Sequence, residues 1–256
     1  MYSIIKGFIL KIVSRKVLFK NEYALRYLYS LFHTGNKYQC NICNKKLRFF
    51  VKMNEDRICP RCGSLQRTRR LWQLLNEKFL REDIKVLDFS PSRSIYRLMK
   101  NKNFSYVSSD LSGDFISDVS YDIRSIDSGN ENYDLTICYH ILEHIDEDID
   151  AMSELYRVLK KGGVCLIQTP FKEGEIYEDN SIISPEQREI HFGQSDHVRI
   201  YSINSLTNRL ERVGFKVEKR NFIERYENIH GFSEKETVLI CYKPKREVAL
   251  SDSVNK

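Results

Sequence analysis

The sequence contains no apolar run near the roughly 18 to 20 residues that a membrane-spanning helix needs. Its apolar N-terminus is interrupted by Lys6 and Lys11 before any site that resembles a signal-peptide cleavage site. No internal repeat is visible. Hydrophobic residues nevertheless make up 41% of the 256 residues and aromatic residues 12%, which excludes a disordered chain and suffices for one substantial domain and a small one.

The sequence also lacks the pattern of a disulfide-bonded protein. Three of its seven cysteines stand alone inside apolar runs that are typical of buried strands: Cys138, Cys165 and Cys241. A secreted chain tends to pair or lose such thiols, so they indicate a reducing compartment. We therefore expect a cytoplasmic protein.

Glycine is missing where a dinucleotide site would need it. The strand expected at Lys85–Phe89 is followed by the turn Ser90-Pro91-Ser92-Arg93-Ser94, so no backbone there can lie close against a pyrophosphate. This argues against NAD and FAD as cofactors. We expect Ser90 to cap the next helix and Pro91 to begin it, an arrangement that suits a phosphate-free cofactor carrying a carboxylate.

The other four cysteines form two C-x2-C pairs, fifteen residues apart: Cys40, Cys43, Cys59 and Cys62. Four thiolates at this spacing can close a tetrahedral Zn²⁺ site, and Pro60 and Gly63 suit the tight turn of the second pair. The pattern predicts a structural zinc ribbon over residues 37–67, with a redox dithiol pair as the alternative. No coordination position is left open for chemistry.

Positive charge is concentrated in the N-terminal third. Residues 1–80 hold 17 Lys and Arg against 4 Asp and Glu, while residues 81–256 hold 24 against 31. Such a basic segment indicates a nucleic acid, a membrane surface or only a solvated face. Apolar positions 4, 5, 8, 9, 12 and 13 predict a helix that either lies in a membrane interface or packs on its own catalytic domain. A second helix, over residues 64–80, should carry Arg67, Arg69 and Arg70 outward.

From Ile84 onward, short apolar runs alternate with helical stretches, the βαβ pattern of an open parallel sheet. We predict a Rossmann-like α/β fold with three α/β/α layers, mostly parallel strands and an antiparallel last strand. The expected domains are a basic helical segment (1–36), a zinc ribbon and connecting helix (37–80), the α/β domain (81–244) and a flexible tail (245–256). We expect strands at 85–89, 106–109, 133–139, 164–169, 215 onward and 237–242, helices at 94–100, through 153–159 and at 205–213, and a loop from 171 to about 198.

Cofactors of such sheets bind at the carboxyl ends of the strands. Asp110 ends the second strand, 22 positions after Asp88, where a carboxylate can accept both ribose hydroxyls of a nucleoside. The strings VLDFS, SSDLSGD, YDLTICYHILEHIDED and ELYRVLKKGGVCLIQTPF resemble the class I, type 11-like S-adenosylmethionine-dependent methyltransferases. CPRCGSLQR and HFGQSDHVRIYS are similar to a bacterial branch with an N-terminal zinc ribbon, and the likeness covers Tyr38 to about Tyr242.

The resemblance implies the cofactor S-adenosyl-L-methionine and a set of residues around it. Asp88 and Ser90 fall on the first cofactor motif, Asp110 and Leu111 on the ribose-binding motif, and Asp122 and Ile123 on the adenine side. Tyr139 and His140 fall on the wall of the cofactor site that follows the fourth strand. The serine-rich first turn departs from the glycines of most of the superfamily, and a non-catalytic binding module is therefore a further alternative.

Two polar groups of residues have competing interpretations. His140-Ile-Leu-Glu143-His144 matches the H-x-x-E-H string of an inverted zinc protease, but a strand feeds directly into it, so Glu143 and His144 are expected to cap and pack the next helix. The acidic run Asp146, Glu147, Asp148 and Asp150 is expected to be that helix's solvated first turn. The segment after strand five gathers five polar residues in the region of the acceptor pocket, where Asp196 and Arg199 could instead pair only with each other: His191, Asp196, His197, Arg199 and Tyr201.

Methyl transfer needs an aligned acceptor and, for a hydroxyl, a base. Our hypothesis assigns this role to His197 with Asp196 as its orienter, with His140 and His191 as other candidate bases. We expect the acceptor to be a glycan, a lipid-linked molecule or a small molecule, with the basic helix peripherally at the inner membrane surface. The alternative is an RNA methyltransferase that uses the ribbon and arginines, although the acidic α/β half would repel RNA.

Overall fold

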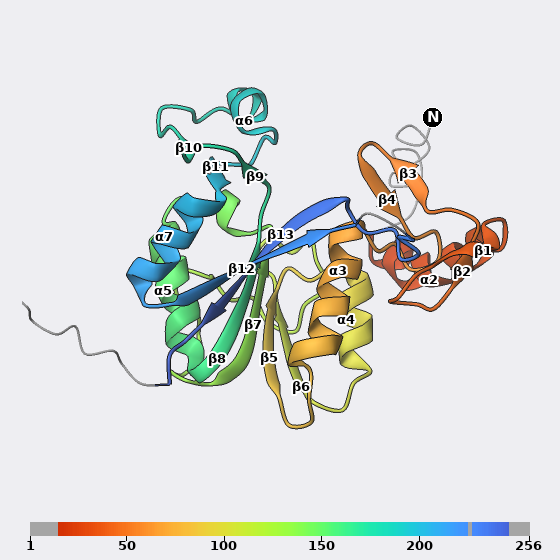
Figure 1. Ribbon diagram of the computed structural model, residues 1–256, viewed down its shortest axis with the longest axis horizontal. Coiled ribbons are helices and arrows are strands. Elements are labelled where there is room, and N and C mark those ends of the chain that lie inside the picture. Colours follow the sequence, from red (N-terminus) through yellow and green to blue (C-terminus); the bar gives the residue numbers. More distant parts are fainter. Residues whose placement is uncertain (1–14, 225–226, 246–256) are drawn as a thin grey trace, which may run out of the picture. The chain divides into compact units, whose positions relative to one another are not determined.

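The computed structural model describes residues 15–224 and 227–245 (Figure 1). The chain divides into two compact units. The first contains the described residues up to Lys78 together with Ile223–Glu234, and the second contains Phe79–Phe222 and the described residues from Lys235. A short segment near the C-terminus therefore belongs with the N-terminal unit.

The second unit is built on a six-stranded sheet with the order β12-β13-β8-β7-β5-β6. Its strands are β5 (Lys85–Phe89), β6 (Ser105–Ser109), β7 (Tyr133–Tyr139), β8 (Leu159–Gln168), β12 (Lys216–Ile223) and β13 (Lys235–Tyr242). Strands β6, β5, β7 and β8 are parallel, and β13 is antiparallel to β8. The predicted Rossmann-like sheet with an antiparallel last strand is confirmed.

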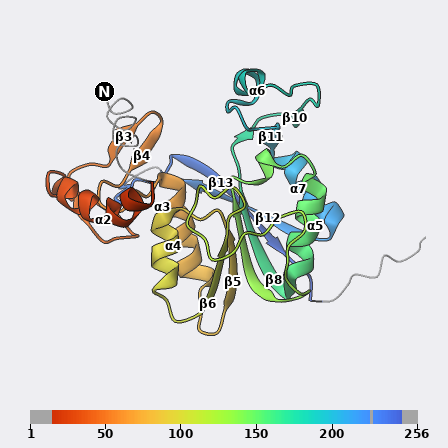
Figure 2. The same cartoon turned by 180° about the vertical axis from the view of Figure 1, so that it is seen from behind.

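Helices cover both faces of this sheet, α4 (Arg93–Lys100) on one side and α5 (Asp148–Val158) with α7 (Ile203–Val213) on the other (Figures 1 and 2). Ser202 caps α7 in a capping box with Ser205, and Gly214 ends it in the left-handed conformation. The apolar faces of α5 and α7 are buried with the sheet in one core, which includes Leu155, Leu206 and Leu210. Burial of these stripes holds the layers together.

The stretch after β8, expected to be a loop, contains regular structure. It forms α6 (Pro185–Phe192) and a three-stranded sheet of β9 (Phe171–Lys172), β10 (Tyr177–Glu178) and β11 (Arg199–Ser202) in the order β10-β11-β9. Because β9 follows the end of β8 directly, this small sheet lies beyond the carboxyl edge of the central sheet (Figure 1). Strands β9 and β10 have only two residues each, which is too short for an alternation of apolar and polar residues to be recognised in the sequence.

The first unit consists of α2 (Arg15–Leu31), two hairpins and α3 (Gln66–Leu74), which continues into the π-helical turn η1 (Leu75–Phe79). The hairpins pair β1 (Thr34–Gln39) with β2 (Lys46–Leu47) and β3 (Val51–Met53) with β4 (Asp56–Ile58). The predicted helical stripe at positions 4–13 lies outside the described residues.

Arg69 and Arg70 of α3 are buried, which corrects the expectation that they point outward. The Arg69 guanidinium donates to the carbonyls of Ser64 (2.7 Å) and Arg57, and to those of His230 (2.6 Å) and Gly231 (2.5 Å). It therefore joins the ribbon to the segment from near the C-terminus. Gly231, at φ +62°, faces the Phe50 ring, which a Cβ would meet at 2.4 Å.

Candidate functional site

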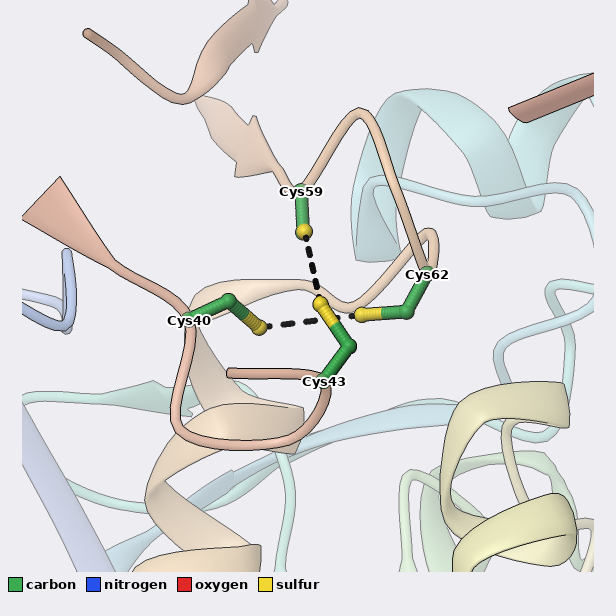
Figure 3. A group of neighbouring side chains, drawn as sticks. All are labelled: Cys40, Cys43, Cys59 and Cys62. Carbon is green, nitrogen blue, oxygen red and sulfur yellow. Dashed lines mark hydrogen bonds between the residues drawn. The ribbon is translucent and has the colours of Figure 1, made fainter. Parts of the chain in front are cut away.

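Four cysteine sulfurs converge in the first unit (Figure 3). Cys40 Sγ lies 3.7 Å from Cys62 Sγ, and Cys43 Sγ lies 3.7 Å from Cys59 Sγ. A tetrahedron with metal–sulfur bonds of ~2.3 Å has edges of ~3.8 Å, so this spacing is that of a Zn²⁺ site and far longer than a disulfide. The four close cysteines could bind zinc as the sequence predicts.

The backbone builds a turn around each cysteine pair. In the first pair, the amide of Asn44 donates to the carbonyl of Cys40 at 2.8 Å. In the second pair, the amide of Gly63 donates to the carbonyl of Cys59 at 2.9 Å. Gly63 has a φ of +77°, a left-handed conformation that glycine adopts without strain. These backbone hydrogen bonds fix the two turns from which the cysteine side chains project.

The turn after β5 keeps a glycine-like backbone although it contains no glycine. Ser90 has a φ of +46°, and its hydroxyl donates to Oδ1 of Asp110 at 2.7 Å. A left-handed residue other than glycine costs about 1 to 2 kcal/mol, so this hydrogen bond offsets part of the strain. Ser92, and not Ser90, caps α4, because the Ser90 side chain is engaged by Asp110; the amide of Ile95 donates to Ser92 Oγ.

Asp110 and Asp88 are both buried but have different hydrogen-bond partners. Asp110, at the end of β6, accepts with Oδ2 from the amide of Gly113 at 2.7 Å and from the Ser112 hydroxyl at 3.0 Å. Asp88 is buried in β5 and accepts a hydrogen bond of 2.9 Å from Tyr106. Burial raises the pKa of Asp88 to about 7, although the Tyr106 hydrogen bond lowers it. Asp110 is thus the carboxylate just beyond the end of β6, whereas Asp88 lies inside the sheet and is bonded to Tyr106.

The remaining predicted cofactor residues lie around the same edge. Leu111 is exposed, as a side chain that covers a flat ligand would be before binding. Asp122 pairs with Arg124 at 2.7 Å, and the hydrogen bonds and charge of Arg124 lower the pKa of Asp122; Arg124 also pairs with Glu147. The Ile123 side chain is buried in the core, which leaves only its backbone to face a ligand.

Strand β7 ends at Tyr139, and His140 follows with a φ of +56°. The His140 amide donates to the carbonyl of Gln168 at 2.8 Å, and its Nδ1 lies 3.2 Å from Oε1 of Glu143. Glu143 is buried in the 3-10 turn η2 (Leu142–His144). Burial raises the pKa of Glu143, but the hydrogen bond and charge of His140 outweigh it, so that pKa lies below its usual value.

Glu143 and His144 do not cap a helix, contrary to the prediction. Helix α5 begins only at Asp148, after Glu147 at its N-cap, and η2 is a separate turn. The H-x-x-E-H string was the signal in the sequence that pointed to these two residues. Because they lie on a short 3-10 turn and not on a long helix, the string does not form the site of an inverted zinc protease. Glu143, His144 and His197 each offer a ligand atom within 4.8 Å of the others.

The predicted pairing of His197 with Asp196 is wrong. Nδ1 of His197 lies 3.2 Å from the carbonyl of Phe192, whereas the exposed Asp196 lies with Oδ2 3.2 Å from Nδ1 of His144. Asp196 lies in a turn that the His197 amide closes on the carbonyl of Gln194, so these adjacent residues reach different neighbours. The two imidazole rings are in edge contact, with centroids 4.6 Å apart. Burial and the nearby His144 lower the pKa of His197.

Arg199 and Tyr201 belong to a buried network and do not line an open pocket. Arg199 pairs with Glu178 at 2.9 Å instead of Asp196, and Tyr201 donates a hydrogen bond to Asp148. Asp148 is buried and also pairs with Arg209 at 2.5 Å, which corrects its assignment to a solvated first turn. His191 is exposed and its Nδ1 lies 2.7 Å from the Tyr177 hydroxyl. Four of the five polar residues contact η2: Asp196 and His197 through His144, and Arg199 and Tyr201 through the carbonyl of Leu142.

The comparisons with known proteins agree with this geometry. A family model described as a methyltransferase domain matches residues 63–220, and the chain therefore belongs to this family. It is a class I S-adenosylmethionine-dependent methyltransferase. No curated protein sequence matches the chain.

Solved structures share the fold at low identity. An Archaeoglobus fulgidus S-adenosylmethionine-dependent methyltransferase is 17% identical, with a TM-score of 0.51 over 69% of this chain and 92% of its own. A chain from the complex between the Haloferax volcanii Trm112 methyltransferase activator and a methyltransferase is 14% identical (TM-score 0.50, 68% and 88%). The [4+2]-cyclase SpnF is 12% identical, with a TM-score of 0.53 over 89% of this chain and 95% of its own.

S-adenosylmethionine is the cofactor of this family. The groups at the carboxyl edge of the sheet suit this cofactor. They are a left-handed turn at Ser90, serine hydroxyls at the start of α4 and the carboxylate of Asp110, which can accept hydrogen bonds from ribose hydroxyls. When bound, the cofactor supplies a methyl group on a sulfonium. No helix among the described residues is long and apolar enough to cross a membrane.

Proposed function

We propose that this methyltransferase transfers the methyl group to a hydroxyl of a glycan, a lipid-linked molecule or a small molecule. Asp110 and Leu111 would hold the ribose side of the cofactor and Asp122 with Ile123 the adenine side, while Ser90 and the start of α4 meet its carboxylate. Tyr139 and His140 would form the wall next to the methyl group. Asp88 lies inside the sheet, without contacting the cofactor.

The observation that carries the proposal is the pair of His140 and Glu143 at the end of β7. Nδ1 of His140 lies 3.2 Å from Glu143 Oε1, and a carboxylate at this nitrogen favours the tautomer with the hydrogen on Nδ1. Nε2 of His140 is then the proton acceptor, and it is buried with no hydrogen-bond partner among the residues that the structure describes. Catalytic bases are oriented in this way by a neighbouring carboxylate.

The chemistry assigned to these residues is simple. The acceptor hydroxyl lies in line with the methyl group, its oxygen forms the new bond to the methyl carbon, and its proton passes to Nε2 of His140. Glu143 stabilises the imidazolium that results. We propose His140 and no longer His197 as the base. Nδ1 of His197 is hydrogen-bonded to the carbonyl of Phe192, and Asp196, its expected orienter, contacts His144 instead.

An RNA acceptor receives less support from the arginines of α3. The guanidinium of Arg69 donates its hydrogen bonds to backbone carbonyls, and that of Arg70 pairs with Glu224. Neither is therefore available for a phosphate. Only Arg67 is partly exposed, at 3.6 Å from Asp56. RNA recognition needs exposed cations and stacking aromatics on one face.

The first unit instead exposes apolar side chains from helix α2 and just beyond it. The exposed fraction is 56% for Leu25, 58% for Leu28 and 82% for Phe32. Nearby, the Arg61 guanidinium lies 3.7 Å from the centroid of the Tyr23 ring. Apolar residues flanked by cations are typical of segments that touch lipid headgroups, and this favours a peripheral membrane contact and a lipid-linked acceptor.

Label transfer from radioactive S-adenosylmethionine tests the proposal. The full chain is incubated with cell extract separated into RNA, lipid-linked saccharides and small molecules, and label is expected in one of the last two fractions. His140→Gln should lower the rate about 100-fold, since general-base catalysis contributes roughly 10²- to 10⁴-fold. Glu211→Gln, on the exposed side of α7, is the control. Label only in RNA would refute the acceptor class, and cofactor binding without any transfer would favour a binding module, as the shared fold of a [4+2]-cyclase illustrates.

A further inference from the structure

Beside the proposed base, three potential metal-ligating side chains gather from two distant segments of the second unit. Glu143 and His144 come from η2, and His197 comes from the stretch between α6 and β11. One ligand atom of each lies within 4.8 Å of the others. Glu143 and His197 are buried, with 1% and 3% of their surfaces exposed.

The oxygen contacts of the two histidines, a hydrogen bond for His197 and an ion-pair contact for His144, involve the same nitrogen on each. Nδ1 of His197 faces the carbonyl of Phe192 and Nδ1 of His144 faces the carboxylate of Asp196, both at 3.2 Å. Because these oxygens only accept, each Nδ1 carries the hydrogen and each neutral ring presents the lone pair of Nε2. Histidines that bind metals are oriented by such a carbonyl or carboxylate on the other nitrogen.

The potential ligand atoms also lack other uses. Nε2 of His197 and Oε2 of Glu143 are buried and have no hydrogen-bond partner within the described part of the chain. Oε1 of Glu143 faces His140, so Oε2 is the oxygen that remains. Buried polar atoms without a partner are rare in native proteins, and two of them next to a third potential ligand, His144, indicate an ion or water that they share.

The backbone that carries these residues is fixed on both sides. The amide of Val198 donates to the carbonyl of Glu143 at 2.9 Å. The guanidinium of Arg199 donates to the carbonyls of Leu142, Ile145 and Asp146. These bonds join the two segments directly next to the cluster, so the ligand geometry is set before a ligand arrives.

We propose that Glu143, His144 and His197 form a second metal site, for a divalent first-row transition-metal ion. Two imidazoles and one carboxylate suit Mn²⁺, Fe²⁺ or Zn²⁺ better than Mg²⁺ or Ca²⁺, which prefer oxygen ligands. Three protein ligands leave positions open, unlike the closed four-cysteine site. Resting on the proposed function, we assign these open positions to the acceptor hydroxyl, held beside His140.

Metal counting on the full chain tests the site without cofactor or acceptor. Elemental analysis first gives the metal that the purified protein carries, and Mn²⁺ is then titrated while electron paramagnetic resonance reports the free ion. We expect one cation per chain beyond the zinc of the ribbon, either carried or taken up. Glu143→Gln and His197→Gln should lose it, and Asp196→Asn should weaken Mn²⁺ binding about tenfold, as changes of groups that orient a metal ligand do.

Matched controls separate the site from folding. Glu211→Gln and His191→Gln change a carboxylate and a histidine of the same unit outside the cluster and should bind as the wild type does. Asp196 is 67% exposed, so Asp196→Asn remains informative if a buried variant fails to fold. The site would be overturned if the protein bound no cation beyond that of the ribbon. It would also be overturned if Asp196→Asn and His197→Gln bound Mn²⁺ as tightly as the wild type does. Metal binding without methyl transfer would refute only the acceptor role.

Discussion

Asp88→Asn should remove a pH dependence from the stability of the second unit. Burial raises the pKa of Asp88 from its ordinary value of 3.8 to about 7. The folded protein therefore binds one proton more than the unfolded chain between these two values. The stability that Asp88 contributes is fully present below pH 4 and is lost as the pH rises through about 7.

The magnitude follows from the pKa difference of about 3 units. At about 1.4 kcal/mol per unit, ionised Asp88 makes the fold roughly 4 kcal/mol less stable than the protonated acid does. An asparagine cannot ionise and still accepts from Tyr106, so the free energy of unfolding of Asp88→Asn relative to wild type should rise by about 1.4 kcal/mol per pH unit between pH 4 and 7.

Urea unfolding of both proteins from pH 4.5 to 8.5, without cofactor, measures this difference. Release of metal by the ribbon at low pH affects both proteins equally and cancels. Tyr106→Phe is the second comparison: it removes the hydroxyl that stabilises the carboxylate and should shift the transition to higher pH. A difference between wild type and Asp88→Asn that stays constant with pH would refute the reasoning.

Two further predictions concern the first unit. Metal analysis of the chain purified without added zinc should give one zinc held by the four cysteines, and Cys62→Ser should unfold the ribbon while S-adenosylmethionine binding persists; a metal-free folded ribbon would contradict this. Arg69→Ala should lower the free energy of unfolding by about 3 kcal/mol or more because it strands four carbonyls, two of them in buried hydrogen bonds, whereas Arg67→Ala should change it by less than about 0.5 kcal/mol; equal effects in urea titrations would refute the structural role of Arg69.

The sequence predicted the regular part of the α/β unit well. Strands β5 and β7 have the predicted bounds, because apolar runs between turn residues are unambiguous when they lie inside a sheet. The cysteine spacing was equally informative, since four ligands at fixed offsets permit few arrangements. Helix α6 and the small sheet after β8 were missed, as their short, partly exposed elements have little periodicity.

Contacts between polar residues that lie far apart in the chain could not be predicted from the sequence. The run of acidic residues after η2 looked solvated, yet Asp148 is buried by Tyr201 and Arg209 from segments more than fifty positions away. Asp196 and His197 are adjacent in the chain but contact different partners, His144 and Phe192. Arg69 looked like part of a basic surface because nothing local revealed that Gly231 would approach it. Tertiary contacts decide such cases, and local patterns do not encode them.

Calorimetric titration of the full chain with S-adenosylmethionine tests the central claim most directly. We predict binding in the micromolar range and a tenfold to hundredfold weakening in Asp110→Asn, from the loss of about 1.5 to 3 kcal/mol of hydrogen bonds to a charged group. Asp114→Asn, exposed on the same turn, should bind like the wild type. Absence of heat with the wild type at high protein concentration, or equal affinity in Asp110→Asn, would contradict the account.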